Sequence, residues 1–398
     1  MLARILHNGG VDATVFESDA SPKARSQGGT LDLHAESGLA AMKEAGLFDE
    51  FLKHARYDGQ YLAFVDKDLY YLAVRGAGDR AKNHVGESPE IDRSKLREFL
   101  IESLPEGMIR WGHHLTKVEG NNLVFKDGSA TGYDLIVGAD GAWSKVRAAI
   151  DPSLEPMYMG VGGFELIIPD AENTAPETYK LVNRGSIFAG WESQRVTMQQ
   201  LGDGSLWVHP TFVREVANWM DHEVCGYDST DRQPVMKALH VEFSEWCPEL
   251  RDALTSTEGK PVPRSMYTLP PGTKWEHTPG LTLIGDAAHL MTPHAGEGAN
   301  QALEDSMLLG RAILGAIKDG KDIDSEIKTF ENNMFARAGK MQQLSYDLTQ
   351  DWMFTPGAPK SVMPRAMSRH VNSTLPSILH PLSTAGIYSY FFFKGLFS

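Results

Sequence analysis

The stretch that decides the fold of this chain is residues 281–306, which read LTLIGDAAHLMTPHAGEGANQALEDS. Its apolar start, residues 281–284, predicts a buried strand, because a short apolar run closed by a glycine is typical of one. A loop rich in glycine and proline follows, and a helical pattern opens at Ala299. A strand, a loop and a helix N-terminus in this order present free backbone N–H groups to an anion or to the polar edge of a ring. The sequence therefore predicts a ligand site here, with an ordinary turn between a strand and a helix as the alternative.

Residues 133–147, YDLIVGADGAWSKVR, repeat this arrangement. The apolar run leads into Gly-Ala-Asp-Gly at 138–141, which places Asp140 at the end of a strand. Ser144 stands where an N-cap is expected for a helix over residues 145–150. A second loop of the same kind is therefore predicted beside the first.

Glu17 follows an alternating strand pattern over residues 11–16. An acidic residue at the end of the second strand of a dinucleotide-binding fold accepts the ribose hydroxyls of an adenosine, about 20 residues after a G-x-G-x-x-G loop. Here residues 2–7 read as the second half of the helix that this loop should open. We therefore expect the first strand and the GxGxxG loop to be absent, and a complete relative to carry on the order of 15–20 more residues upstream. A truncated gene model or splice form is favoured over a natural derivative with impaired cofactor binding.

The composition is that of a globular enzyme, with 42% hydrophobic and 23% charged residues among 398. A formal net charge of −14 and the lack of a basic stripe argue against a nucleic-acid partner. Two cysteines, Cys225 and Cys247, have neither metal-ligand spacing nor a disulfide pattern, so no metal is expected. No signal peptide is recognised at the N-terminus, and a cytoplasmic location is expected.

The strand patterns divide the chain. Residues 1–155 read as an α/β domain that includes a hairpin at 61–74. Residues 156–270 carry longer alternating strands, which predict an antiparallel sheet with a hairpin turn at Gly202-Asp203-Gly204. Residues 271–350 return to the first domain with a strand and two helices.

Residues 351–398 form a tail that is expected to be helical and apolar. Residues 375–393 are apolar enough for membrane contact, but His380 and Pro381 interrupt them. A tail packed against the enzyme or against a dimer partner is favoured over an interfacial anchor, and a monomer or a homodimer is expected.

Three blocks carry a resemblance to a known family. They are FESDASPKARSQGGTLDLHAESGLAAMKEAGL at 16–47, PEIDRSKLR at 89–97 and LIGDAAHLMTPHAGEGAN at 283–300. They resemble the FAD-dependent aromatic hydroxylases, or class A flavin monooxygenases, and among these the tetracycline-inactivating flavin monooxygenases. The fold that this implies is a glutathione reductase-like dinucleotide-binding FAD domain with an antiparallel-sheet substrate domain.

The resemblance implies FAD as cofactor and NADPH as co-substrate. Asp286 would accept a ribityl hydroxyl, Arg93 would reach the flavin diphosphate or ribityl oxygens, and Arg25 would meet the nicotinamide nucleotide phosphate. The complete set of candidate cofactor-binding residues is Glu17, Arg25, Asp32, Arg93, Asp140, Asp286, Gly298 and Ala299.

The resemblance also implies a reaction, in which reduced flavin adds O₂ at C4a and the hydroperoxide transfers one oxygen to an electron-rich ring. No general base has a recognisable pattern, so no catalytic residue is assigned. Phe188, Trp191 and Trp207 replace the polar tetracycline contacts of that group, which favours another aromatic or polyketide-like small molecule, in secondary metabolism or antibiotic inactivation. A Baeyer–Villiger outcome stays open. The alternatives are a flavin oxidoreductase without oxygen insertion and a truncated, non-catalytic relic.

Overall fold

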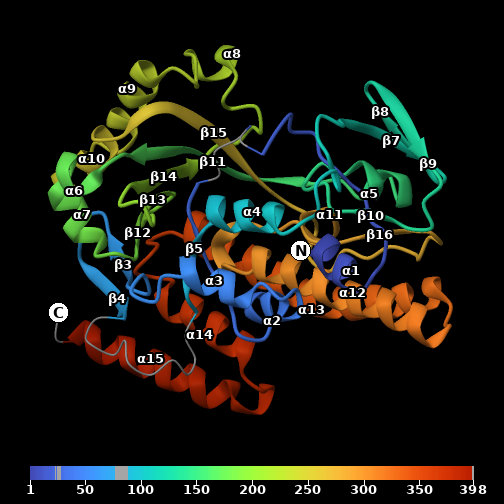
Figure 1. The fold of residues 1–398 in the computed structure, drawn as a ribbon. Helices are drawn as coiled ribbons and strands as arrows, with labels where there is room; N and C mark the ends of the chain where they lie inside the picture. The colour runs from blue at the N-terminus through green and yellow to red at the C-terminus, as the bar shows by residue number, and fades with distance from the viewer. Residues whose placement is uncertain (23, 25–27, 77–87, 397–398) are drawn as a thin grey trace. The chain divides into compact units, whose positions relative to one another are not determined.

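The computed structural model describes residues 1–22, 24, 28–76 and 88–396. The chain forms two compact units, each assembled from three separate segments (Figure 1). Unit 1 comprises Met1–Ala55, Gly86–Met157 and Tyr267–Gln343. Unit 2 comprises Arg56–Val85, Tyr158–Met266 and Leu344–Ser398. Residues 56–85, which the sequence analysis placed in the first domain, belong to the second unit instead.

Unit 1 is built from short strands and helices. Its strands are β1 (Val15–Phe16), β2 (Thr30–Asp32), β5 (Glu90–Asp92), β6 (Ile109–Arg110), β7 (Leu115–Glu119), β8 (Asn122–Phe125), β9 (Gly128–Thr131), β10 (Ile136–Gly138) and β16 (Leu281–Leu283). Its helices are α1 (Leu2–Asn8), α2 (Gly38–Glu44), α3 (Phe48–His54), α4 (Arg93–Glu102), α5 (Lys145–Ile150), α11 (Asp286–His289), η1 (Pro293–Ala295) and α12 (Gly298–Asp319). The pairs β1–β6 and β10–β16 are parallel, β2–β5 is antiparallel, and β7, β8 and β9 form an antiparallel meander. The α/β class predicted from the sequence is confirmed.

Gly138 lets the predicted strand–loop–helix of residues 133–150 pack closely in this unit. A Cβ at this position would lie 2.6 Å from the Leu283 side chain and 2.7 Å from that of Val146. Both neighbours belong to one hydrophobic cluster of the unit. A side chain at 138 would therefore push β16 or α5 away, which a densely packed interior resists.

Unit 2 contains a seven-stranded sheet in the order β15-β11-β14-β13-β12-β3-β4. Its strands are β3 (Leu62–Asp66), β4 (Tyr71–Arg75), β11 (Met157–Ile168), β12 (Ser186–Trp191), β13 (Gln194–Gln200), β14 (Leu206–Val213) and β15 (Glu258–Thr268). Its helices are α6 (Ala171–Thr174), α7 (Pro176–Val182), α8 (His222–Cys225), α9 (Arg232–Glu242), α10 (Pro248–Thr255), α14 (Met363–Thr374), η2 (Ser377–Leu379) and α15 (His380–Leu396). The long helix α13 (Ile323–Phe354) contributes residues to both units.

The sheet corrects one expectation and confirms another. The predicted hairpin at 61–74 exists, as β3 and β4, but β3 pairs with β12, so the hairpin belongs to this sheet and not to the first domain. The antiparallel sheet predicted for residues 156–270 is confirmed by the pairs β11–β14, β14–β13 and β13–β12, whereas the additional pairing of β3 with β12 is parallel. A local pattern of alternating residues identifies a strand but does not say which distant strand will be its neighbour. The turn at Gly202-Asp203-Gly204 is confirmed, because the Leu201 N–H donates to the Ser205 carbonyl.

The two faces of this sheet differ in chemistry, as side chains alternate along each strand. One face is apolar and forms a hydrophobic core with residues of α6, α7, α9 and α10. We call the opposite one the polar face. It is defined by Phe64, Phe188, Arg195, Thr197, Gln199, Trp207, His209 and Thr211, which the strand register places together.

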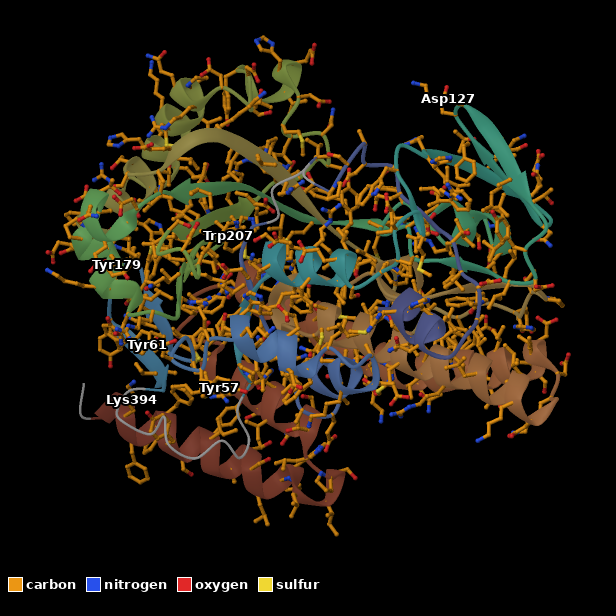
Figure 2. All side chains as sticks on the ribbon, viewed as in Figure 1. Tyr57, Tyr61, Asp127, Tyr179, Trp207 and Lys394 are labelled. Atoms are coloured by element: carbon orange, nitrogen blue, oxygen red, sulfur yellow. The ribbon has the colours of Figure 1, made fainter. Side chains whose placement is uncertain are left out.

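The C-terminal segment is helical, as predicted. The Asn372 side chain of α14 donates to the Thr384 hydroxyl of α15, over 3.1 Å. The Lys394 ammonium donates to the carbonyls of Tyr71 and Leu72 over 2.8 and 2.7 Å, which fixes the end of α15 to the edge strand β4 (Figure 2). No helix in the described part of the chain is both long and apolar enough to cross a membrane.

Candidate functional site

The strand β16 is buried along its length and ends at Gly285, which adopts φ 59° and ψ −141°. Only glycine takes up this conformation without strain. Asp286 follows it at the start of α11, and its side chain is open to solvent. Surrounding protein atoms nevertheless raise the pKa of its carboxyl by desolvation, while the positive charges of His289 and Arg93 act in the opposite direction. Asp286 thus offers a hydrogen-bond acceptor in a crowded but accessible place.

A buried ionic network stabilises the loop that follows β16. Asp305, fully buried on α12, accepts from the Gly285 N–H at 2.8 Å and pairs with His289 at 2.6 Å. Its other oxygen accepts from Arg337 at 2.5 Å. Burial alone would raise the pKa of Asp305, but these three partners together lower it, so the carboxylate stays charged. The charged Asp305 carboxylate therefore fixes the conformation of Gly285 by accepting from its N–H.

Asn300 connects the start of α12 to the end of β2. Its side-chain amide donates to the Asp32 carbonyl at 2.9 Å and accepts from the His34 N–H at 2.9 Å. Gly296 lies close to Asp32, since a Cβ at this position would come within 4.0 Å of the Asp32 carboxylate. The side chain of Asp32 is itself bound by the His34 imidazole at 3.1 Å.

His34 lies between two carboxylates. Its imidazole nitrogens approach Asp32 at 3.1 Å and Glu297 at 3.5 Å. Hydrogen bonds to Asp32 and then to Glu297 raise the pKa of His34 to about 10 from an ordinary 6.5. The imidazolium joins β2 to the loop before α12.

We expect the interactions of His34 with Asp32 and Glu297 to make the unfolding free energy fall at alkaline pH. Because folding raises the pKa of His34, its contribution is complete below pH 6.5 and is lost as the pH rises towards about 10. The unfolding free energy of the unaltered protein should therefore decline relative to that of His34→Gln across this range. Denaturant titrations of both proteins at a series of pH values test this. Curves that stay parallel from pH 6.5 to 10 would contradict it.

The N-terminus of α12 points its free N–H groups out of the loop. Gly298 and Ala299 form its first turn, and Glu297 at the N-cap makes no side-chain hydrogen bond to them. The first N–H groups of this helix are thus available to an anion or a polar ring edge. Arg93, at the start of α4, is exposed, and no described residue bonds to its guanidinium. Its effect on the pKa of Asp286 places it in the same neighbourhood.

Asp140 and Glu17 have local partners. The Asp140 carboxylate accepts from the Lys145 N–H at 2.7 Å, at the start of α5. Ser144 accepts from the Arg147 N–H at 2.9 Å, which confirms the predicted N-cap. Glu17 follows β1, and its carboxylate accepts from the Asp19 N–H at 2.9 Å. Arg25 lies outside the described residues.

Arg147 was missed as a structural link between the two loops. Its guanidinium is buried and donates to the carbonyls of Ala142 at 2.5 Å, Leu154 at 2.9 Å and Ala287 at 2.9 Å. It therefore ties residues 138–144 to α11. The sequence Ser-Lys-Val-Arg at 144–147 indicated the helix cap but gave no sign of this bond across the unit.

A second group of polar residues lies on the polar face of unit 2. Arg195 is 5% exposed and lies between Gly190 and Thr211 on the neighbouring strands. Its guanidinium stacks over Trp352 at 4.8 Å, and no described residue forms a hydrogen bond or an ion pair with it. Desolvation lowers the pKa of Arg195 to about 10. A buried cation without a partner is costly, so its position demands a functional reason.

Two aromatic ring nitrogens on β14 are also buried without a hydrogen-bond partner among the described residues. The buried Trp207 Nε1 and His209 Nε2 have no hydrogen-bond partner among the described residues, and their rings lie 4.8 Å apart. Desolvation lowers the pKa of His209 to about 4, so this imidazole is neutral at physiological pH. The sequence analysis treated this sheet as apolar and missed Arg195 and His209. Of its three aromatics, Trp207 and Phe188 lie on the polar face, whereas Trp191 packs on the core side.

The comparisons with known proteins agree with the loop geometry. Residues 273–345, which hold β16, Asp286 and α12, match the family described as an FAD binding domain. The sequence is 28% identical over 351 residues to monooxygenase asqM of Emericella nidulans, which covers 76% of this chain and 78% of that protein. The chain is an FAD-dependent monooxygenase, and it resembles the class A group of these enzymes.

Solved structures share the fold of the monooxygenase. HpxO of Klebsiella pneumoniae, complexed with FAD and uric acid, gives a TM-score of 0.71 at 17% identity, over 98% of this chain and 93% of that one. The tetracycline destructase Tet(55) gives a TM-score of 0.68 at 16% identity, over 94% and 93% of the two chains. The two-part fold expected from the sequence resemblance is thus shared with both.

The residues of the loop fit FAD. An acceptor at Asp286 suits a ribityl hydroxyl, an unpaired cation at Arg93 suits the diphosphate, and the uncapped N-terminus of α12 suits the oxygen-bearing edge of the flavin ring. We propose that Asp32, Gly298 and Ala299 line the same site. Among the described residues no cluster of His, Cys, Asp or Glu is arranged to hold a metal ion.

Replacing Asp286 by alanine is expected to weaken FAD binding by about tenfold or more, because a hydrogen bond to a charged acceptor contributes about 1.5–3 kcal/mol. The fold should persist, since the Asp286 carboxylate has no partner among the described residues. Titration of the apoprotein with FAD, followed by flavin fluorescence, measures the effect. Asp127→Ala, at the exposed β8–β9 turn, is the control. An affinity equal to that of this control would show that Asp286 does not contact the cofactor.

Proposed function

We propose that the monooxygenase uses NADPH and O₂ to hydroxylate an aromatic or polyketide-like small molecule. The observation that carries the substrate class is the polar face, where an unpartnered cation lies among aromatic rings. Bound FAD supplies the activation of O₂. The protein's own task is to bind the ring, orient it and keep water out.

Arg195 is the residue that would select the charge of the substrate. A guanidinium buried without a counter-ion attracts a ring that carries a phenolate, an enolate or a carboxylate. Its pairing with such a group would also compensate the desolvation that the free protein bears. We infer that the bound substrate is anionic at its polar edge.

Trp207 and His209 would orient that ring. The indole N–H is only a donor, whereas a neutral imidazole both donates and accepts. A substrate with an oxygen acceptor toward Trp207 and a second polar group toward His209 would satisfy both buried nitrogens. An enzyme pocket built in this way rejects a ring that lacks these groups, because the nitrogens then stay unpaired.

The aromatic side chains around Arg195 support a planar ligand. Phe64 stacks on Trp352 at 5.7 Å and on Phe188 at 5.4 Å, with interplanar angles of 11° and 24°. These parallel rings form an apolar wall beside the cation. HpxO binds the planar molecule uric acid, which is consistent with a flat substrate on this fold. We place the reaction in secondary metabolism or antibiotic inactivation, on the strength of the sequence resemblance to tetracycline-inactivating enzymes.

The proposal is tested by the dependence of NADPH oxidation on the added ring. A panel of phenols and aromatic polyketides is compared with the matching O-methyl ethers, which keep the shape but cannot ionise. We expect a phenol of the right shape to accelerate NADPH oxidation by about tenfold or more, and its ether to have little effect, since only the anion pairs with Arg195. Equal acceleration by phenol and ether, or no response to any ring, would refute the proposed substrate class.

A further inference from the structure

The outer side of α15 is an exposed apolar surface. The side chains that point outward there, together with those of the preceding turn, are Ile378, Leu379, Leu382, Tyr388, Tyr390, Phe392 and Phe393. We call this set the α15 surface. It contains no charged residue, and Ile378 and Leu382 are 83% and 74% exposed. An apolar patch of this extent marks a binding surface more often than a free one.

The α15 surface is held in place from the other side of the helix. Ser383 and Thr384 contact Asn372 on α14, and Lys394 bonds to the carbonyls of β4. The helix therefore already has a packed inner side within unit 2. Its outer side is a second, separate face.

The charge of this part of the chain identifies what covers the surface. Residues 352–398 contain Lys360, Arg365, Arg369 and Lys394 but no aspartate or glutamate. The whole chain carries a formal net charge of −14, so residues 1–351 carry −18 and this segment carries +4. A segment of 47 residues without an acid, in so acidic a protein, is suited to an acidic surface.

We infer that the α15 surface lies on a lipid bilayer with anionic headgroups. Tyrosine and phenylalanine side chains on one side of a helix are typical of the membrane–water interface. A helix that cannot cross the bilayer lies in its plane.

The apolar side chains would supply most of the binding. Lys360 pairs with Asp66 at 2.7 Å and Arg365 with Asp351 at 2.6 Å, and Arg369 pairs with both Asp347 and Asp351. The attraction of these three cations to lipid is therefore largely compensated within the protein. The net positive charge then serves mainly to orient an otherwise repelled acidic protein. This inference does not depend on the substrate or on the flavin chemistry.

Vesicle flotation with the full chain tests the inference. The vesicles contain phosphatidylcholine alone or with about one third phosphatidylserine. We expect binding to the anionic vesicles, weakened at ~0.5 M salt. The double variant Phe392→Ser/Phe393→Ser should lower partitioning by at least about tenfold. Val241→Ser removes a side chain that is 70% exposed on α9 and should bind like the unaltered protein.

Three results would overturn the inference. They are no binding to either vesicle, binding that is independent of phosphatidylserine, and binding that the double variant retains. A homodimer in sedimentation that the double variant dissociates, without vesicle binding, would assign the surface to a second copy. FAD affinity is measured in each variant and should not change. A failed flotation would therefore refute the membrane inference without bearing on the proposed monooxygenase function.

Discussion

Replacing Arg195 by methionine is expected to stabilise the monooxygenase and to impair it. The buried guanidinium bears a desolvation cost that no hydrogen bond or ion pair from the described residues offsets, and stacking over Trp352 compensates only part of it, so its removal should raise the unfolding free energy by about 1–3 kcal/mol. The same change should lower kcat/KM for an anionic ring by about ten- to a hundredfold, because a charge-assisted hydrogen bond is lost. Denaturant unfolding and steady-state kinetics measure the two effects.

Opposite signs in these two measurements separate a functional cation from a structural one. If the arginine were structural, its removal would lower the unfolding free energy, and the activity would fall together with it. Arg184→Met is the matched control, since Arg184 is exposed and its one ion pair with the described residues is to the exposed Asp58, at 3.0 Å. Its effect on both quantities should be small. A loss of stability in Arg195→Met would show that the guanidinium holds the fold together.

Replacing Asp305 by alanine is expected to cost about 3–5 kcal/mol of unfolding free energy. The change leaves His289 and the Gly285 N–H without this acceptor in a buried place, and it removes one of the acceptors of Arg337, which keeps Gln301 and Glu304. FAD affinity should fall as well, because Gly285 no longer holds Asp286 in position. Denaturant unfolding of the apoprotein separates the first effect from the second.

Asp319→Ala provides the control on the same helix. The Asp319 side chain is half exposed and, within the described part of the chain, pairs with Lys321 alone, at 3.5 Å, so its removal should change stability by no more than about 0.5 kcal/mol. Asp305→Asn should lie between the two, since it keeps an acceptor but loses the charge. A loss below about 1 kcal/mol in Asp305→Ala would mean that the network contributes little to holding the loop.

The cofactor loop could be predicted from the sequence because its physical requirements are local. A buried strand, a glycine in a conformation closed to other residues and a helix N-terminus leave a pattern within one short stretch. Helix α12 begins at Gly298, one residue from the predicted start. The Ser144 cap was equally local, and the structure confirms it.

The polar face could not be predicted, because its chemistry comes from the pairing of distant strands. Arg195 and His209 look like ordinary residues of alternating strands until β13 and β14 align them. The stacking of Trp352 on Arg195 brings together residues far apart in the chain. The predicted domain of the hairpin β3–β4 was wrong for the same reason, since its partner strand β12 lies far along the sequence.

The origin of the oxygen in the product tests the central claim most directly. The purified protein, loaded with FAD, is supplied with NADPH, the accelerating ring and ¹⁸O₂ in ordinary water, and the product is examined by mass spectrometry. A monooxygenase yields a product that carries one ¹⁸O atom, and its turnover stops when O₂ is removed. A product without the label, or turnover that continues under anaerobic conditions with another electron acceptor, would contradict a monooxygenase.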